Sequence, residues 1–129
     1  MKKIILAACL STFLVGCATT NTLQAGKGDS TKFTVENKTY DQVWKSSVKA
    51  MSNQLIIVEK SKENGVIKAE KGVGMATWGE VVGVFISPAN KPAPKYTVEV
   101  QSYKRSRLQI TGQNWTQSIV TAIEADLDQ

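Results

Sequence analysis

Two glutamates are the leading candidates for proton transfer in this chain. Glu80 and Glu99 lie in segments with strand-like patterns, where a carboxylate beside a lysine or tyrosine could act as general acid and base. Isolated carboxylates on strands are more often ordinary surface residues. A raised pKa inside a pocket would be needed to support acid-base chemistry. We therefore expect no enzymatic activity.

Metal and cofactor sites are also poorly supported by the composition. The 129 residues contain no histidine, and the two cysteines are Cys9 and Cys17. Zinc sites of the cysteine and histidine kind, cysteine-histidine nucleophile pairs and serine triads are therefore unavailable. No calcium loop of the D-x-[DN]-x-[DN]-G type is present, and GKGDS at residues 26–30 lacks the spacing of a phosphate loop. We expect neither a metal nor a cofactor.

The first residues of the chain have the pattern of a secretory signal. Lys2 and Lys3 precede an uncharged apolar run at residues 4–15, which is too short to span a bilayer. The run closes on LVGC at residues 14–17, which resembles the lipobox of bacterial lipoproteins. The alternative is an ordinary secreted protein in which this cysteine is a coincidence.

The lipobox resemblance implies that residues 1–16 form a signal peptide that is cut off before Cys17. Cys17 would then carry a diacylglycerol thioether and an N-acyl chain such as palmitate, and several chains anchor a protein more stably than one. Cys9 would be lost with the signal, so the mature chain would contain no disulfide. Ala18 replaces the aspartate that retains such lipoproteins at the inner membrane. The resemblance thus implies an outer-membrane lipoprotein that faces the periplasm.

Residues 17–30 are predicted to form a flexible tether, because they are small and polar with almost nothing to bury. Order is expected to begin at TKFTVEN, residues 31–37. There Phe33 and Val35 alternate with polar residues, which is typical of a half-buried strand. A single domain is therefore expected over residues 31–129.

A helix is predicted after this strand. Thr39 and Gln42 have the spacing of a capping box, in which each side chain bonds the main chain of the other residue. Apolar residues then recur every three or four positions, which gives one buried stripe. The stripe consists of Tyr40, Val43, Trp44, Val48 and Met51.

A hairpin is predicted next, around Asn64-Gly65. This pair favours a type I′ turn, in which both central residues have positive φ. The flanking strands are expected at residues 55–60 and from Ile67 onward, where Ile67 and Ala69 alternate with charged residues.

The segment GVGMATWGEVVGVFISP, residues 72–88, is predicted to be a strand that is apolar on both faces. Glu80 interrupts it, and its apolar part is too short to cross a bilayer. No Lys-Ser or Lys-Thr pair follows the glycines, so a phosphate loop is not supported. The alternation places Trp78, Glu80, Val82, Val84 and Ile86 on one face, and Gly79, Val81, Gly83 and Phe85 on the other.

Gly79 and Gly83 share one face of this predicted strand. Glycine there allows close packing of a helix on a curved sheet, or leaves a hollow for an apolar ligand. Close packing is favoured, because isolated glycines in strands usually have a packing reason. The proline-containing loop at residues 88–95, PANKPAPK, is either a simple stop or an extended segment offered to a partner.

A second hairpin is predicted from KYTVEVQSYK, residues 95–104, and RLQITG, residues 107–112. Lys104, Arg105 and Arg107 gather at its turn. Three charges in a turn are most often a solvated tip, and the alternative is contact with anionic lipid or peptidoglycan. The periplasmic address removes nucleic acid as a routine partner.

The last predicted element is an amphipathic helix that starts with Asn114 as its N-cap. Its stripe comprises Trp115, Ile119, Ile123 and Leu127, with Val120 and Ala122 beside them. Glu124, Asp126 and Asp128 lie at the negative end of the helix dipole. They are either frayed, solvated acids or an acidic contact surface.

These elements predict an α+β domain with a curved antiparallel sheet, in the order β-α-β-β-β-β-β-α. The arrangement looks like the helix-grip fold. The segments YDQVWKSSVKAM, IIVEKSKENGVIKAE and WTQSIVTAIEADL also resemble small envelope lipoproteins with a BamC-like domain. Gly65, Ile67 and Ala69 match the G-x-I-x-A motif of that family. The resemblance covers residues 31–129 and brings no catalytic residue with it.

Two functions follow from these observations. The first is a non-enzymatic interaction or accessory module in envelope assembly or maintenance, held at the membrane by Cys17 and bound to an envelope protein. The alternative is a carrier or sensor of an apolar ligand, in a cavity between the sheet and the C-terminal helix. Trp78, Phe85, Trp115 and Ile119 would form the walls of that cavity, with Gly79 and Gly83 beside them.

Overall fold

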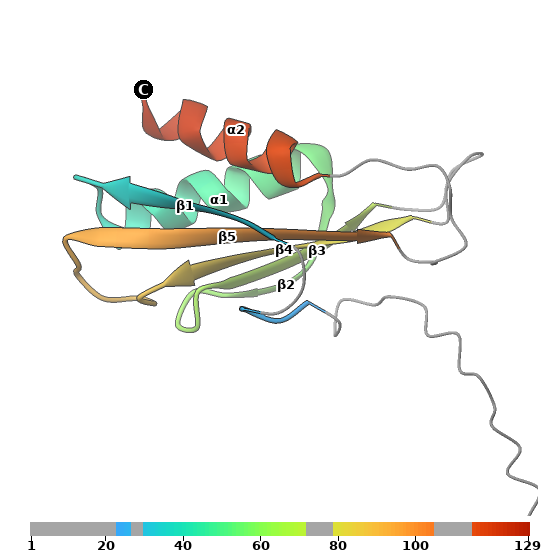
Figure 1. Ribbon diagram of the computed structural model, residues 1–129, viewed down its shortest axis with the longest axis horizontal. Helices are drawn as coiled ribbons and strands as arrows, with labels where there is room; N and C mark the ends of the chain where they lie inside the picture. The colour runs from blue at the N-terminus through green and yellow to red at the C-terminus, as the bar shows by residue number, and fades with distance from the viewer. Residues whose placement is uncertain (1–22, 27–29, 72–78, 105–114) are drawn as a thin grey trace, which may run out of the picture.

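The computed structural model describes residues 23–26, 30–71, 79–104 and 115–129. They form an α+β domain in the order β-α-β-β-β-β-α (Figure 1). The elements are β1 (Ser30–Glu36), α1 (Tyr40–Gln54), β2 (Ile56–Ser61), β3 (Val66–Lys71), β4 (Glu80–Ser87), β5 (Lys95–Lys104) and α2 (Thr116–Leu127). The additional strand predicted at residues 107–112 lies outside the described residues.

The five strands make one antiparallel sheet in the order β1-β5-β4-β3-β2. Strands β2 to β5 follow one another as a meander. Strand β1 pairs with β5, and Phe33 lies opposite Val98. The first strand of the domain is therefore held by the last strand that the structure describes.

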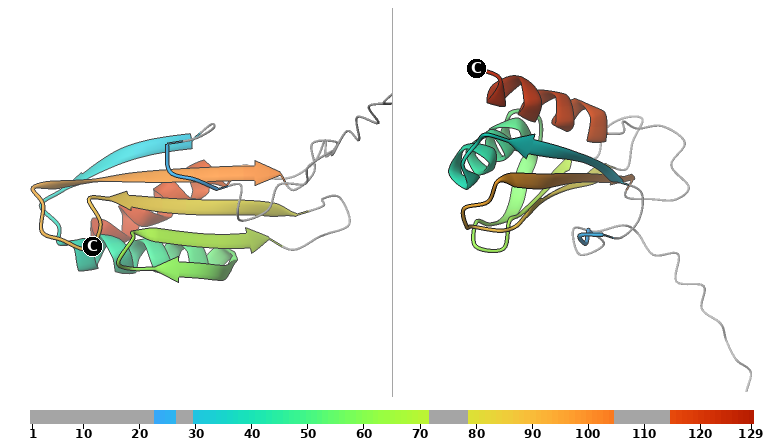
Figure 2. Two further views of the ribbon diagram at one scale, coloured as in Figure 1. Left: turned by 90° about the horizontal axis from the view of Figure 1, so that it is seen from below. Right: turned by 60° about the vertical axis from the view of Figure 1, so that its left-hand side comes forward.

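Both helices cover the same face of the sheet, and residues 23–26 lie on the opposite face (Figure 2). We call these two surfaces the helix face and the strap face, and residues 23–26 the strap. In the described parts of the chain, no helix is both long enough and apolar enough to cross a membrane.

Strand β4 is apolar on both faces, as predicted, and all its residues from Glu80 to Ile86 are buried. Val82, Val84 and Ile86 point into the main core beneath the helices. Val81 and Phe85 belong to a second apolar cluster on the strap face. The alternation predicted for residues 80–86 is therefore confirmed, whereas residues 72–78 of the predicted strand lie outside the described residues.

Helix α1 starts at the predicted capping box. The main-chain N–H of Gln42 donates to Oγ1 of Thr39 at 3.1 Å, and the N–H of Thr39 donates to Oε1 of Gln42 at 2.8 Å. The apolar stripe of the helix faces the sheet. Its buried members include Tyr40, Val43, Trp44 and Met51.

The hairpin between β2 and β3 is confirmed, but the predicted type I′ turn is wrong. The turn spans residues 62–65, and Gly65 has a φ of 67° while Asn64 does not have positive φ. Gly65 also lies against β4. A Cβ at this position would be 2.3 Å from the carbonyl oxygen of Ile86. Close approach to the neighbouring strand therefore adds to the need for glycine at residue 65.

Helix α2 begins at Thr116, with Trp115 rather than Asn114 at the N-cap position. Trp115 has helical dihedral angles and its side chain makes no capping bond, whereas Asn114 lies outside the described residues. The predicted stripe is confirmed, because Ile119, Ile123 and Leu127 are buried. Helix α2 packs against α1, β1 and β5.

The strap departs from the flexible tether predicted for residues 17–30. Leu23 is only 1% exposed and packs with Val81 and Phe85. The sequence shows a single leucine among polar residues, which has no periodicity to indicate burial. Leu23 docks on an apolar strip of the strap face. Residues of β4 and of other strands, all distant from Leu23 in the sequence, form this strip.

Candidate functional site

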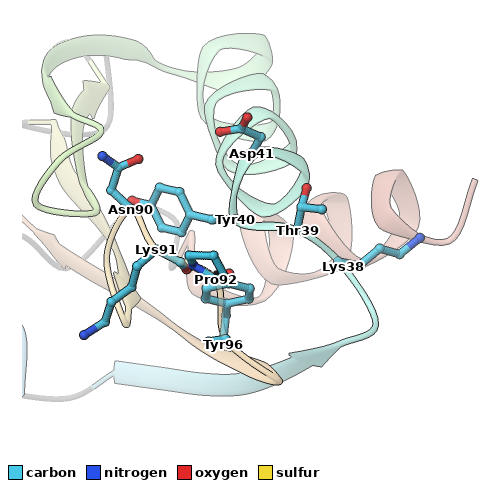
Figure 3. A pocket seen from close by; sticks show the side chains of 9 residues that line it. Lys38, Thr39, Tyr40, Asp41, Asn90, Lys91, Pro92 and Tyr96 are labelled. Atoms are coloured by element: carbon cyan, nitrogen blue, oxygen red, sulfur yellow. Dashed lines mark hydrogen bonds between the residues drawn. The ribbon is translucent and has the colours of Figure 1, made fainter.

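The N-terminal end of α1 and the loop between β4 and β5 enclose an open pocket with a volume of about 360 Å³ (Figure 3). The loop is the proline-containing segment whose role the sequence left open. The pocket is lined by Lys38, Thr39, Tyr40, Asp41, Asn90, Lys91, Pro92, Ala93 and Tyr96. The pocket therefore combines apolar surface, from aromatic rings and aliphatic side chains, with charged groups at its rim.

Two tyrosines form the inner wall of this pocket. The rings of Tyr40 and Tyr96 are 5.7 Å apart between centroids and inclined by 55°. The hydroxyl of Tyr40 donates to the carbonyl of Lys62 at 2.7 Å. The hydroxyl of Tyr96 donates to the carbonyl of Lys91, also at 2.7 Å. Both hydroxyls thus hold neighbouring loops in place, and the two rings, which are 6% and 1% exposed, form the buried floor of the pocket.

Two ionisable groups of the pocket, Tyr40 and Asp41, have pKa values that are shifted away from neutral pH. Burial raises the pKa of Tyr40, against a smaller lowering by its hydrogen bond with the main chain of Asn90. The hydrogen bond and charge of Lys62 lower the pKa of Asp41, and their charged atoms are 2.7 Å apart. At pH 7 the tyrosine is therefore neutral and the aspartate is ionised.

Two asparagines precede the lysines of the pocket and shape its edges. Asn37 and Asn90 have φ values of 60° and 49°, in the left-handed region that asparagine tolerates better than most residues. Each is followed by a lysine that lines the pocket, Lys38 or Lys91. The Asn-Lys pair occurs at both edges of the pocket and is visible in the sequence. It has no helix or strand periodicity, so the patterns used to predict the elements did not indicate it.

The proposed walls of a ligand cavity do not come together. Trp115 and Ile119 are buried in the main core on the helix face. Phe85 and Gly83 lie on the opposite strap face, beside Leu23. Gly79 is buried just before β4 with a φ of 97°, and Trp78 lies outside the described residues. Phe85 and Ile119 therefore cannot line one cavity beneath α2.

The two glutamates considered for catalysis are buried rather than exposed. Glu80 is on the helix face, opposite Lys71 and Lys104 in the register of the sheet. Glu99 is on the strap face, where it accepts hydrogen bonds from Gln101 and Gly26. Burial raises the pKa of Glu99, but these bonds outweigh that effect and leave its pKa below the usual value. Glu99 is therefore an ionised acceptor and lacks the raised pKa of a general acid.

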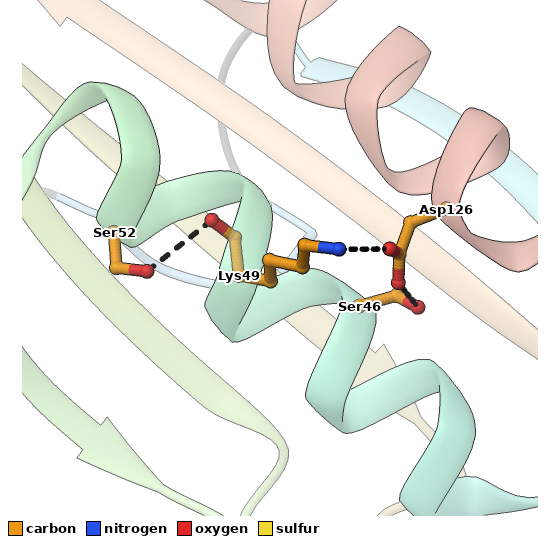
Figure 4. A network of polar contacts seen from close by, with 4 residues as sticks. All are labelled: Ser46, Lys49, Ser52 and Asp126. Carbon is orange, nitrogen blue, oxygen red and sulfur yellow. Dashed lines mark hydrogen bonds and ion pairs between the residues drawn. The ribbon is translucent and has the colours of Figure 1, made fainter.

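A polar network joins the two helices outside the pocket (Figure 4). Asp126 of α2 accepts a hydrogen bond from Ser46 at 2.5 Å and pairs with Lys49 at 2.7 Å, both from α1. Ser52 bonds the carbonyl of Lys49. Asp126 therefore fastens one helix to the other, which offsets its unfavourable place at the negative end of the α2 dipole.

The remaining predicted site residues are not described. Cys17, Arg105 and Arg107 fall outside the described residues, and Lys104 is placed only as the last residue of β5. Among the residues that are described, no group of three or more aspartate, glutamate, cysteine or histidine side chains could hold a metal ion.

Comparison with known proteins adds no assignment. The chain matches no protein-family model and no curated protein. The functional proposal therefore rests on the pocket, the strap and the N-terminal sequence.

Proposed function

We propose that this chain is a lipid-anchored periplasmic module that binds an envelope protein and catalyses no reaction. The observation that carries the proposal is the open pocket whose floor is formed by the contacting rings of Tyr40 and Tyr96. Their hydroxyls donate to main-chain carbonyls, and the pKa values of Tyr40 and Asp41 are shifted away from neutral pH. An open pocket of this kind offers a binding surface without chemistry.

The chemistry of the pocket favours an extended segment of a partner protein. An apolar side chain of that segment would fill the pocket above Tyr40 and Tyr96, which are buried beneath its surface. Lys38 and Lys91 lie on opposite sides of the pocket (Figure 3) and would attract acidic groups of the segment, while Asp41 is already paired with Lys62. Pro92 and Ala93 give the loop an apolar edge against which such a segment can lie.

Membrane attachment through Cys17 and delivery to the outer membrane are part of this proposal. They are supported by the basic start, the apolar run and the LVGC sequence. Contact of Lys104, Arg105 and Arg107 with an anionic surface stays a prediction. The carrier of an apolar ligand is not proposed further, because its wall residues lie on opposite faces of the sheet.

The relation to the helix-grip fold and to BamC-like domains also remains a proposal. It is supported by the two helices on one face of an antiparallel sheet. The G-x-I-x-A motif has a structural reason in this chain. Gly65 makes the close approach to β4, and Ile67 and Ala69 are fully buried under the helices.

The proposal is tested in the native envelope with the full chain. A photo-crosslinking amino acid replaces Pro92 at the pocket, and a matched control carries it at exposed Gln117 of α2. We expect an envelope protein to be crosslinked from position 92 and much less from position 117. Mass spectrometry of the mature chain checks the lipid on Cys17. Equal yields from both positions would contradict binding at the pocket.

A further inference from the structure

The strap is held on the sheet by one buried side chain and by its own main chain. Leu23 fills the space above Gly83, where a Cβ would lie 3.3 Å from Cβ and Cδ1 of the leucine. The amide side chain of Gln101 accepts from the N–H of Gln24 at 3.3 Å and donates to its carbonyl at 2.5 Å. The carboxylate of Glu99 accepts from the N–H of Gly26 at 3.2 and 3.0 Å.

These contacts form a built docking site rather than a chance overlap. Glu99 and Gln101 are both buried, and Nε2 of Gln101 donates to Oε1 of Glu99 at 2.9 Å. A buried carboxylate and amide are costly unless they are hydrogen-bonded, and the main chain of the strap bonds to both of these groups. The docked strap therefore combines burial of an apolar side chain with hydrogen bonds to the polar groups that it covers.

Docking shortens the reach between the domain and Cys17. Leu23 is six residues beyond Cys17, and a fully extended chain spans about 3.3–3.6 Å per residue, so the two α-carbons are at most about 20 Å apart. If the domain were held only from Ser30, thirteen residues would allow about 45 Å. Docking of the strap thus reduces the maximum distance between Cys17 and the domain by about half. This limit holds for any conformation of the residues between them.

This shorter reach limits how the domain can stand on a membrane. An anchor on the helix side would have to pass the sheet and a layer of helices about 10–12 Å thick, about 20 Å in all. Only a fully stretched tether would allow that arrangement. On the strap side no such layer intervenes. Ile56 of β2, which lies opposite Glu70 on the strap face, is 66% exposed and offers apolar contact to a bilayer.

We propose that the docked strap orients the anchored domain, with the strap face toward the lipid bilayer and the helix face away from it. The inference rests on the proposed lipid anchor at Cys17. Tyr40 and Tyr96 belong to the helix side of the sheet, so this orientation leaves the pocket open to a partner in the periplasm. The strap thereby sets which surface the module presents.

The test uses the full-length lipidated chain in vesicles of phosphatidylethanolamine and phosphatidylglycerol that contain a spin-labelled lipid quencher. A fluorescent label is attached to a single introduced cysteine, either T97C on the strap face or T121C on α2. Both threonines are exposed. We expect quenching at position 97 to exceed quenching at position 121 several-fold.

Two strap variants make the test specific. Leu23→Asp places a charge in the apolar site and is expected to release the strap, so that the two labels are quenched to similar extents. Gln24→Ala is the matched control, since only the main chain of Gln24 bonds to Gln101, and it is expected to keep the difference. The melting temperature of each variant confirms that the domain remains folded.

The outcomes separate the orientation from the anchor. A chain that does not float with vesicles lacks the lipid and overturns both the anchor and the orientation. A chain that floats but shows equal quenching at positions 97 and 121 overturns the orientation alone. Unchanged quenching in Leu23→Asp would show that the strap does not set the orientation.

Discussion

Leu23 lies against the α-carbon of Gly83, and this contact joins the N-terminal strap to the central strand of the sheet. The glycine has no side chain, so the leucine can approach the main chain of β4 closely. Leu23 was predicted to lie in a free tether and Gly83 in a strand, and the two thus pack together with Val81 and Phe85. Several consequences of this unit and of the neighbouring contacts can be measured.

Replacing Gly83 with valine should expel the strap while the sheet is retained. An added Cβ at Gly83 would lie 3.1 Å from Cε2 of Phe85 and 3.3 Å from Leu23, and the two additional methyl groups of valine would compete for the space of the leucine side chain. Valine itself suits a strand. We expect the main-chain amides of Gln24 and Gly26 to exchange hydrogen at least about tenfold faster, which follows from loss of their hydrogen bonds.

Thr97→Val is the matched control for that experiment, because Thr97 is exposed on the same face of the sheet and belongs neither to the Leu23 cluster nor to the hydrogen bonds of the strap. It should leave the exchange of both amides unchanged. If Gly83→Val kept the slow exchange of the Gly26 amide, the packing of Leu23 on β4 would not be what holds the strap.

Strap docking should weaken in acid through Glu99. The pKa of Glu99 is lowered in the folded chain by bonds from Gln101, Gly26 and Ser30 and by the charge of Lys32, against the opposing effect of burial. Docking therefore favours the ionised form. Its contribution is complete above the ordinary glutamate pKa of about 4.3 and is lost as the pH falls through the lowered value.

Hydrogen exchange at Gly26, corrected for the intrinsic effect of pH, measures this dependence. Glu99→Gln keeps an oxygen acceptor but cannot titrate, so its docking should be weaker at pH 7 and should not change further in acid. A wild-type strap that stayed equally protected down to the lowest pH at which the domain remains folded would contradict the role of ionised Glu99.

Asp126 should contribute an acid-sensitive part of domain stability. Hydrogen bonds from Lys49 and then Ser46 lower its pKa, so the stabilisation is present above the ordinary aspartate pKa and is lost as the pH falls below it. Asp126→Asn should lower the melting temperature slightly at pH 7 and flatten its decline in acid. Asp128→Asn is the control at an exposed neighbouring residue. Equal thermal shifts in both variants would indicate only a general charge effect.

Gly65→Ala should destabilise the domain by at least about 2 kcal/mol, because alanine is strained at positive φ and its Cβ would meet the carbonyl oxygen of Ile86. Gly26→Ala is the matched control. Gly26 also has positive φ, but nothing lies within 4 Å of an added Cβ, so only the local strain of about 1 kcal/mol is expected, and it falls on strap docking. Chemical denaturation measures both, and similar unfolding free energies would contradict the close contact with β4.

Local sequence patterns predicted the elements that are determined by residues close together in the chain. The capping box of Thr39 and Gln42 depends on residues three positions apart, and the alternation of Val82 and Val84 depends on the strand itself. The turn type failed at Asn64, because Gly65 is placed by its contact with Ile86 of another strand. Patterns within a segment contain no information about such a neighbour.

The candidate site was less predictable for the same reason. Tyr40 matched the stripe of a helix and Tyr96 the alternation of a strand, so neither pattern indicated that the two rings would pack together at the floor of a pocket. The pairing of β1 with β5 was likewise not predicted. Leu23 gave no signal of burial, since its binding site is assembled by strands β4 and β5.

Partner binding at the pocket is tested most directly by reversing one charge at its rim. Lys91→Glu changes the charge that faces the partner, and it keeps the carbonyl that accepts from Tyr96. Lys95→Glu is the control, since Lys95 is also exposed and lies at the start of β5 outside the pocket lining. Crosslinking from position 92 in the native envelope should fall several-fold with Lys91→Glu and remain with Lys95→Glu. Equal yields in both variants would contradict recognition of a partner by this pocket.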